Sequence, residues 1–211
     1  MKETVFTVPM ALSDYIPVIL FGISALLLIR DLKNKMTKGG FATLCLGAAV
    51  AFLAGFFKAS YKLLFAVGVG EVAFLNSSFL PLQSTGLLLT GLSLVLMLVL
   101  RKKSAALAMA PLTMGFISMM VLGLGGMCAS LGVVAVKMKK KLLIPVFILC
   151  FFCYMGMGYL ASSKDGSAAS NWIEQGVNTV GQILLLCGVS ALHRSGLKEL
   201  RLEKETVSQA S

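Results

Sequence analysis

Polar side chains that could bind a solute or an ion recur at helical spacing near the end of this chain. Glu174, Asn178 and Gln182 follow one another at intervals of four residues in NWIEQGVNTVGQILLL. Residues four apart lie on one face of a helix, so a carboxylate and two amides form a stripe. Because an apolar run follows directly, we expect this stripe to lie inside a membrane-spanning helix. Polar groups are costly there and usually face an interior cavity.

Two earlier apolar segments also carry polar residues at helical spacing. In the first, they fall at positions i, i+3 and i+4: Lys58, Tyr61 and Lys62. In the second, they recur every seven residues: Asn76, Gln83 and Thr90. Glu174 is the one carboxylate that we place within a span. A carboxylate at that depth needs a cation or a proton, and Lys58 or Lys62 is the cation available.

The composition defines the class of protein that must position these residues. Of the 211 residues, 57% are hydrophobic and only 13% are charged. The apolar residues form long runs separated by short basic clusters, which is typical of a polytopic membrane protein. The net charge of +10 comes from clusters at the ends of these runs rather than from one continuous basic face. We therefore interpret the Lys and Arg residues as topology signals and expect no nucleic-acid partner.

Runs of about 17 to 25 apolar residues are long enough to cross a bilayer as helices. Five spans are predicted, at residues 12–29, 41–63, 72–100, 142–161 and 170–192. The remaining stretch, 104–136, would extend about 50 Å as one helix, against a hydrocarbon core of about 30 Å. It forms either one strongly tilted span or two short ones. Three glycines in LGLGGM offer a hairpin turn between two short spans: Gly123, Gly125 and Gly126.

The distribution of basic residues distinguishes these two possibilities. With seven spans and the N-terminus outside, four basic clusters lie on the cytoplasmic side: residues 30–38, 101–103, 137–141 and 194–204. With six spans, the last two clusters change side, against the preference of cytoplasmic loops for Lys and Arg. The sequence therefore predicts an all-α bundle of seven transmembrane helices, with six as the alternative.

The chain contains no segment long enough for a soluble domain. We divide it into a transmembrane helical domain, residues 1–193, and a cytoplasmic tail of mixed charge, residues 194–211. If the fourth span is a linker, the others form two triplets of equal orientation, in which Gln83 pairs with Asn178 and Gly86 with Gly181. Such a 3+1+3 arrangement is similar to that of small sugar and vitamin transporters built from triple-helix bundles. This is an analogy of architecture alone.

Under the seven-span topology, the polar residues lie at comparable depths. At 1.5 Å per residue, Lys58 and Gln83 lie about 25 Å from the cytoplasmic ends of their spans, and Glu174 about 27 Å. We predict a polar cavity that is open to the outside. The ligand-binding candidates are Glu174, Asn178, Gln182, Lys58, Lys62, Gln83, Asn76 and Tyr61. The alternative interpretation is structural, because lysines snorkel at the interface and amides form hydrogen bonds between helices.

The sequence contains no motif typical of catalysis, metal binding or cofactor binding. Cys150 and Cys153 form C-F-F-C, but in an apolar run without the electropositive setting of a reactive thiol. His193 is the single histidine and has no cluster of other metal ligands around it in the sequence. No P-loop, nucleophile elbow or dinucleotide fingerprint occurs. We therefore name no catalytic residue, metal ligand or cofactor.

These patterns favour a small transporter or permease-like protein that binds a small polar or charged solute. The alternatives are a membrane enzyme that acts on lipid and a non-catalytic subunit or sensor. The expected partners are the lipid bilayer, a small solute, and a membrane-protein partner or a second copy of the chain. The expected location is the plasma membrane of a prokaryote, with the N-terminus outside and the C-terminus in the cytoplasm.

Overall fold

The described part of the chain is mostly α-helical and contains no strand. The structure is a computed structural model that describes residues 6–99, 115–162 and 168–200. Seven α-helices lie in these ranges: α1 Val8–Ser13, α2 Tyr15–Leu32, α3 Lys38–Ala66, α4 Ala73–Val99, α5 Phe116–Lys137, α6 Ile144–Ser162 and α7 Ala168–Arg194. Two short 3₁₀ turns precede α6 and follow α7: η1 Lys141–Leu143 and η2 Leu197–Glu199.

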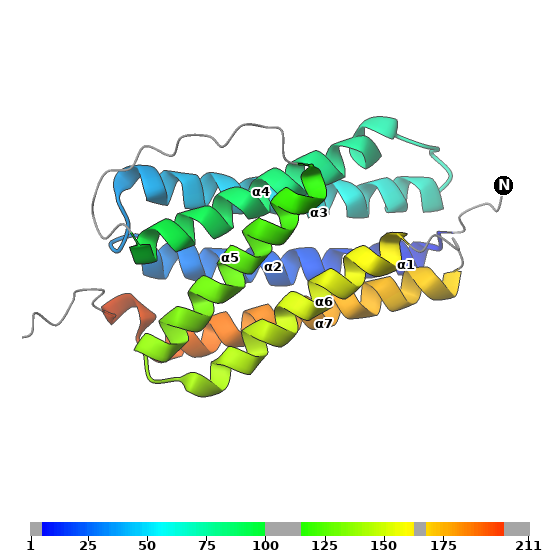
Figure 1. Cartoon of the computed structure of the whole chain (residues 1–211). Coiled ribbons are helices and arrows are strands. Elements are labelled where there is room, and N and C mark those ends of the chain that lie inside the picture. Colours follow the sequence, from blue (N-terminus) through cyan, green and yellow to red (C-terminus); the bar gives the residue numbers. More distant parts are fainter. Residues whose placement is uncertain (1–5, 100–114, 163–167, 201–211) are drawn as a thin grey trace, which may run out of the picture.

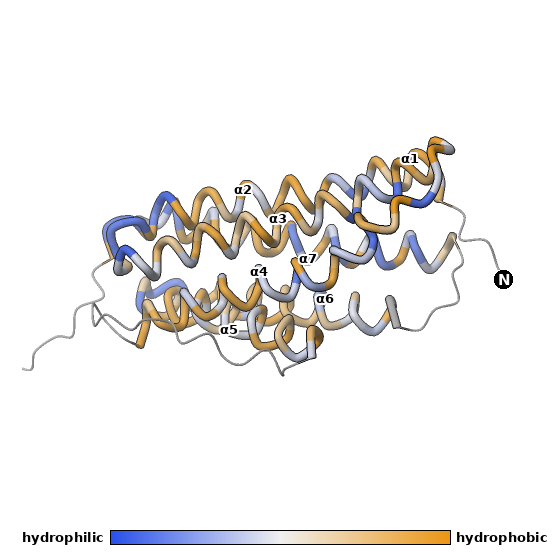
Figure 2. The backbone as a smooth tube through the Cα atoms, turned by 90° about the horizontal axis from the view of Figure 1, so that it is seen from above, coloured by the Kyte–Doolittle hydropathy of each residue, from blue (hydrophilic) through white to orange (hydrophobic). Residues whose placement is uncertain are grey.

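Six helical segments of the described chain are long and apolar enough to cross a membrane, with α1 and α2 acting together as the first. Their bounds are Val8–Leu32, Lys38–Ala66, Ala73–Val99, Phe116–Lys137, Lys141–Leu160 and Ala168–Arg194. The predicted class, an all-α helical bundle of an integral multi-pass membrane protein, is confirmed. Figure 2 shows the corresponding pattern, with hydrophobic colour along most of each helix and hydrophilic colour at the helix ends and along part of α7.

Local sequence accounts for both ends of α3. Thr37 stands before the helix in an extended conformation, and its hydroxyl accepts a hydrogen bond from the backbone N–H of Gly40 at 3.1 Å. This is the usual role of a threonine N-cap. After α3, Gly68 and Gly70 adopt positive φ angles of 83° and 103°, which glycine tolerates without a Cβ clash. The chain thereby turns back sharply into α4.

The six spanning segments form a closed ring, in which each packs mainly against two neighbours. The order around the ring is α2, α3, α4, α5, α6, α7 and back to α2. Chain neighbours such as α3 and α4 run antiparallel, as the contacts of Gly47 with Thr90 and of Gly86 with Ala51 show. The helices α2 to α4 and α5 to α7 are therefore two consecutive triplets, which meet along two seams (Figure 1).

The helices at both seams run parallel. Between α4 and α5, Gly123 lies against Leu87, and Gly126 lies further along against Val95. Between α2 and α7, Gln175 bonds to Ser13 near one end, and His193 bonds to Asp31 near the other. The two triplets consequently have the same orientation, as the 3+1+3 interpretation requires.

The predicted count of seven spans is not confirmed, because the described residues contain six. The first part of the disputed stretch, residues 104–114, lies outside the described ranges, and the second part is the single helix α5. The predicted hairpin at LGLGGM is wrong, since all three of its glycines lie within α5. Two of them face α4 instead. A Cβ at Gly91 would lie 1.9 Å from the carbonyl oxygen of Gly123, so only glycine permits this close approach.

The parallel seams place the basic clusters of the described residues at one end of the bundle, here called the basic end. It comprises the connections at residues 30–38 and 137–141 and the segment that follows Arg194. An apolar core of fully buried leucines fills the bundle next to it: Leu32, Leu44, Leu94, Leu131, Leu185 and Leu192. The opposite end, where α3 ends and α4 and α7 begin, is called the cavity end.

Candidate solute-binding site

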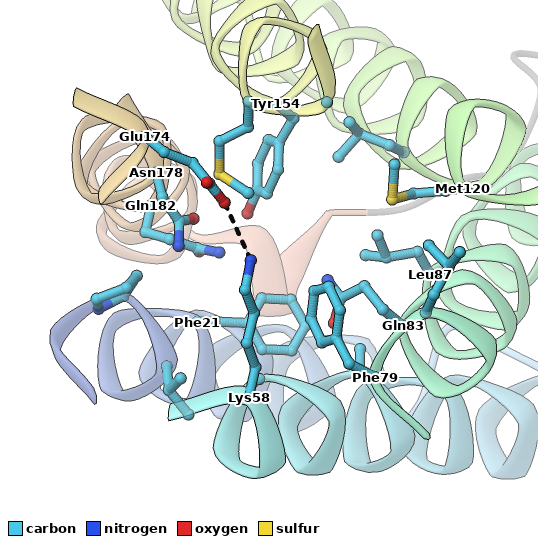
Figure 3. A pocket seen from close by; sticks show the side chains of 18 of the residues that line it. Phe21, Lys58, Phe79, Gln83, Leu87, Met120, Tyr154, Glu174, Asn178 and Gln182 are labelled. Carbon is cyan, nitrogen blue, oxygen red and sulfur yellow. Dashed lines mark hydrogen bonds and ion pairs between the residues drawn. The ribbon is translucent and has the colours of Figure 1, made fainter. Parts of the chain in front are cut away.

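A cavity of about 670 Å³ lies inside the ring, toward the cavity end. All six spanning segments contribute to its wall, and Figure 3 shows their side chains converging on it. Its size falls within the range of about 300 to 1,000 Å³ that is usual for small-molecule sites. Among the predicted candidates, five line this cavity: Lys58, Gln83, Glu174, Asn178 and Gln182.

An ion pair spans the cavity between the two triplets. Lys58 Nζ, on α3, lies 3.0 Å from Glu174 Oε1, on α7 (Figure 3). The side chains are 29% and 17% exposed, so the pair is only partly shielded from solvent. Lys58 Nζ also lies 4.6 Å from the centre of the Phe79 ring, a favourable cation–π distance. The predicted pairing of Glu174 with a lysine is therefore present in the structure.

A second ion pair lies beside the cavity, and its acidic partner was not among the predicted residues. Lys62 Nζ lies 2.7 Å from Asp14 Oδ2, with side chains 8% and 7% exposed. Asp14 stands at the break between α1 and α2 and lines the cavity, whereas Lys62 does not. Asp31 is likewise buried, near the other end of the same span. The prediction that Glu174 is the one carboxylate within a span is therefore wrong.

Side chains of neighbouring helices form hydrogen bonds around the helix break at Asp14. Gln175 Nε2, on α7, donates to the carbonyl oxygen of Ser13 at 2.7 Å. The hydroxyls of Tyr15 and Ser60, on α2 and α3, lie 2.9 Å apart. Because a helix break leaves backbone carbonyls without their internal partners, these side chains stabilise an otherwise costly irregularity inside the bundle.

The deeper wall of the cavity carries uncharged polar groups. Gln83 on α4, Tyr154 on α6 and Gln182 on α7 point into it (Figure 3). Gln83 Oε1, Gln182 Oε1 and Tyr154 OH are buried and have no hydrogen-bond partner within the described residues. Tyr154 was missed because its surroundings, LCFFCYMGM, resemble an aromatic apolar run. Its hydroxyl, unusual in such a run, was the available signal.

Three predicted residues do not line the cavity. Asn76 is exposed near the start of α4. Tyr61 packs edge-on against Phe6, with ring centres 6.3 Å apart, and also against Phe65. Lys62 is directed to Asp14. Helical spacing shows which residues share one face of a helix. It does not show whether that face points into the cavity or packs against a neighbouring helix.

Most of the remaining lining is apolar, which the predicted polar cavity did not include. Phe21, Leu87, Met120 and Leu124 surround the polar groups from three helices, α2, α4 and α5. Phe21, Leu87 and Leu124 also belong to the buried core that continues toward the basic end. The cavity is therefore closed on that side, and a ligand would contact both apolar and polar groups.

A separate polar cluster joins α2 and α7 at the basic end. His193 Nδ1 lies 2.7 Å from Asp31 Oδ2, and Arg30 contacts the same imidazole. Lys35 donates to the carbonyl oxygen of Leu200. The pKa of Lys35 is lowered, because burial disfavours its charged form more strongly than Asp31 favours it. In the described part of the chain, no group of three or more His, Cys, Asp or Glu residues could hold a metal ion.

Comparison of the chain with protein-family models, with curated proteins and with solved structures finds no match. The site must therefore be interpreted from its own geometry.

Proposed function

We propose that this chain is a small transporter or permease-like membrane protein that binds a small solute in the cavity. The observation that carries the proposal is the set of buried polar oxygens that line the cavity and have no hydrogen-bond partner in the described ranges. Leaving such an oxygen unpaired costs about 1 to 3 kcal/mol, and a bound solute with hydrogen-bond donors would offset that cost. A ring packed only for stability would fill this space with apolar side chains.

The position of the cavity supports an outward-facing site. Most Lys and Arg residues in the described connections between helices lie at the basic end. Cytoplasmic loops of membrane proteins are enriched in these two residues. We therefore place the basic end in the cytoplasm and the cavity end outside. The buried core between the cavity and the basic end then closes the path to the cytoplasm.

The two parallel triplets also favour transport. Many transporters are built from repeated helical units, with the substrate bound at the interface between them. Here α2 to α4 supply Lys58 and Gln83, and α5 to α7 supply Tyr154, Glu174 and Gln182. A lipid-modifying enzyme is less well supported, since Lys58 and Glu174 pair with each other and Tyr61 lies outside the cavity.

The proposal is tested by filling the cavity. Val121 lines it from α5, whereas its neighbour Leu122 is 52% exposed on the outside of the bundle. Cells that produce wild type, Val121→Trp or Leu122→Trp are incubated with a mixture of small solutes, and their extracts are compared by mass spectrometry. We expect at least one solute to accumulate with wild type and Leu122→Trp but not with Val121→Trp.

Equal amounts of the three proteins in the membrane are required and are measured by immunoblotting. If no solute distinguishes Val121→Trp from Leu122→Trp at equal amounts, the proposed function is wrong.

A further inference from the structure

The cavity has two levels along the bundle axis. Nearest the cavity end lie the Lys58–Glu174 pair and Phe79. Gln182 lies eight residues beyond Glu174 on α7, about 12 Å deeper at 1.5 Å per residue. Tyr154 lies at a similar depth, because a Cβ at Gly181 would lie 3.9 Å from its ring. Gln83 lies about 6 Å deeper than Lys58, because Gly86, three residues further along α4, packs against Ala51, which is seven residues deeper than Lys58 on α3. The deep level therefore contains uncharged polar groups, and the charged groups lie above it.

Every charged side chain that lines the cavity from the described residues already has a partner of opposite charge. Lys58 and Glu174 pair with each other, and Asp14 pairs with Lys62. A charged solute would have to separate one of these pairs or remain unpaired at the deep level. Both arrangements are unfavourable, since an uncompensated charge in a low-dielectric site loses its hydration without an equivalent gain.

At the deep level, in contrast, three buried oxygens have no hydrogen-bond partner among the described residues: Gln83 Oε1, Gln182 Oε1 and Tyr154 OH. Gln182 and Tyr154 are only 6% and 8% exposed, so bulk solvent has little access to them. The amide oxygens of Gln83 and Gln182 are acceptors, and the hydroxyl of Tyr154 both donates and accepts. A solute with at least two donors would satisfy the two amide oxygens at once.

The apolar surfaces at the same level restrict the solute further. Phe21, Leu87, Met120 and Leu124 leave most of the wall without polar atoms. A strongly hydrated solute such as a free sugar would lose water along this wall without replacement. A solute with one apolar face and one hydrogen-bonding face matches the arrangement.

From these observations, and resting on the proposed function, we infer that the solute is uncharged and amphipathic. It carries at least two hydrogen-bond donors and occupies the deep level between Gln83, Tyr154 and Gln182. The Lys58–Glu174 pair lies above this position and stays intact beside the bound solute.

The inference is tested with matched compounds and purified full-length protein. Phenyl, indole and cyclohexyl scaffolds are each prepared in four forms: uncharged with two hydroxyl donors, the same compound with both hydroxyls methylated, a cationic amine, and an anionic carboxylate. Thermal stabilisation in detergent is measured for wild type and for Val121→Trp. We expect the uncharged donor form to stabilise the wild type most, and its effect to be lost in Val121→Trp.

Gln182→Leu provides an independent readout. Replacing an unpartnered buried amide by an apolar side chain of similar size should leave the free protein as stable as wild type or more stable. The same change should weaken binding of the donor compound at least tenfold. A variant that is merely misfolded would lose stability as well, so the two effects distinguish binding from folding.

The possible outcomes separate the two proposals. Cavity-dependent binding of the charged or methylated forms in preference to the donor form would overturn the inferred solute class and leave the proposed function standing. Absence of cavity-dependent binding by any of the compounds would overturn the solute class as well. The proposed function itself is decided separately, by the uptake comparison of Val121→Trp and Leu122→Trp.

Discussion

Lys58 and Lys62 lie one helical turn apart on α3, yet they have different environments. Lys58 reaches across the cavity and is partly exposed, whereas Lys62 is buried against Asp14 at the break between α1 and α2. Removal of one member of a buried ion pair leaves the other charge without compensation, which typically costs about 3 to 5 kcal/mol. For a partly exposed pair, solvent screens the remaining charge and the cost is smaller. The two lysines are therefore matched controls for each other.

We expect Lys62→Met to destabilise the protein by several kcal/mol and Lys58→Met by clearly less. The thermal unfolding midpoint is measured in detergent micelles, and a denaturant titration then gives the free energy of unfolding. Combining Asp14→Asn with Lys62→Met should restore part of the loss, because neither charge is then left alone. Equal destabilisation by the two lysine variants would contradict this assignment of the pairs.

Lys58→Met should instead affect the cavity. Without its cation, Glu174 lies at the mouth of the cavity with no opposite charge beside it. We expect reduced uptake of the solute found with wild type, at a normal amount of folded protein. Unchanged uptake would show that the pair has no part in entry.

At the scale of single residues, the sequence predicted the inward stripe of α7 well. Glu174, Asn178 and Gln182 share a face, and a polar stripe in an apolar helix has few alternatives to an interior position. Asp14 was not predicted as part of the site. Its role depends on a helix break and on an ion pair with Lys62, which lies far away in the sequence. Contacts between residues on different helices of a bundle leave no recognisable pattern in the local sequence.

At the scale of helices, the predicted spans and the observed ones agree closely outside the disputed stretch. Basic clusters and the glycines after α3 mark the ends of apolar runs, and a bilayer sets their length. The error at LGLGGM has a physical reason. Glycine favours turns because it lacks a Cβ, and for the same reason it allows two helices to approach closely. Only the presence of Gly91 opposite distinguishes these uses.

The contact between α4 and α5 gives a prediction at this scale. A Cβ at Gly123 would lie 2.4 to 2.5 Å from backbone atoms of Leu87 and Leu88. Gly132 lies on the same helix, and a Cβ there meets nothing within 4 Å. We expect Gly123→Ala to destabilise the protein by about 1 to 3 kcal/mol through overpacking, and Gly132→Ala to change its stability by less than about 0.5 kcal/mol.

Thermal unfolding of both variants in the same detergent measures this difference. Similar midpoints for Gly123→Ala and wild type would show that α4 and α5 do not touch through their glycines.

At the scale of the whole molecule, the parallel seams determine which connections share a side of the membrane. Lys33, Lys140 and Ser195 lie at the basic end, and Glu71 lies at the cavity end. Single cysteines at these positions, in a background without the five native cysteines, can be labelled in intact cells with a membrane-impermeant maleimide. We expect the cysteine at position 71 to react and the other three to be protected until the membrane is opened.

Labelling of position 140 together with position 71 would contradict the parallel arrangement of α4 and α5. Charge counting had likewise placed the last two basic clusters on the same side as the first two. The side of a cluster depends only on whether the number of crossings before it is odd or even.

The two seams between the triplets differ in what holds them together. Along α4 and α5, backbone meets backbone at Gly91 and Gly123, with no side chain between them that could change rotamer. Along α2 and α7, the contacts include polar side chains at both ends, from Gln175 and His193. Such contacts can break and form again individually. The seam between α4 and α5 is therefore the fixed one, and any movement of the two triplets relative to each other would change the side-chain contacts between α2 and α7.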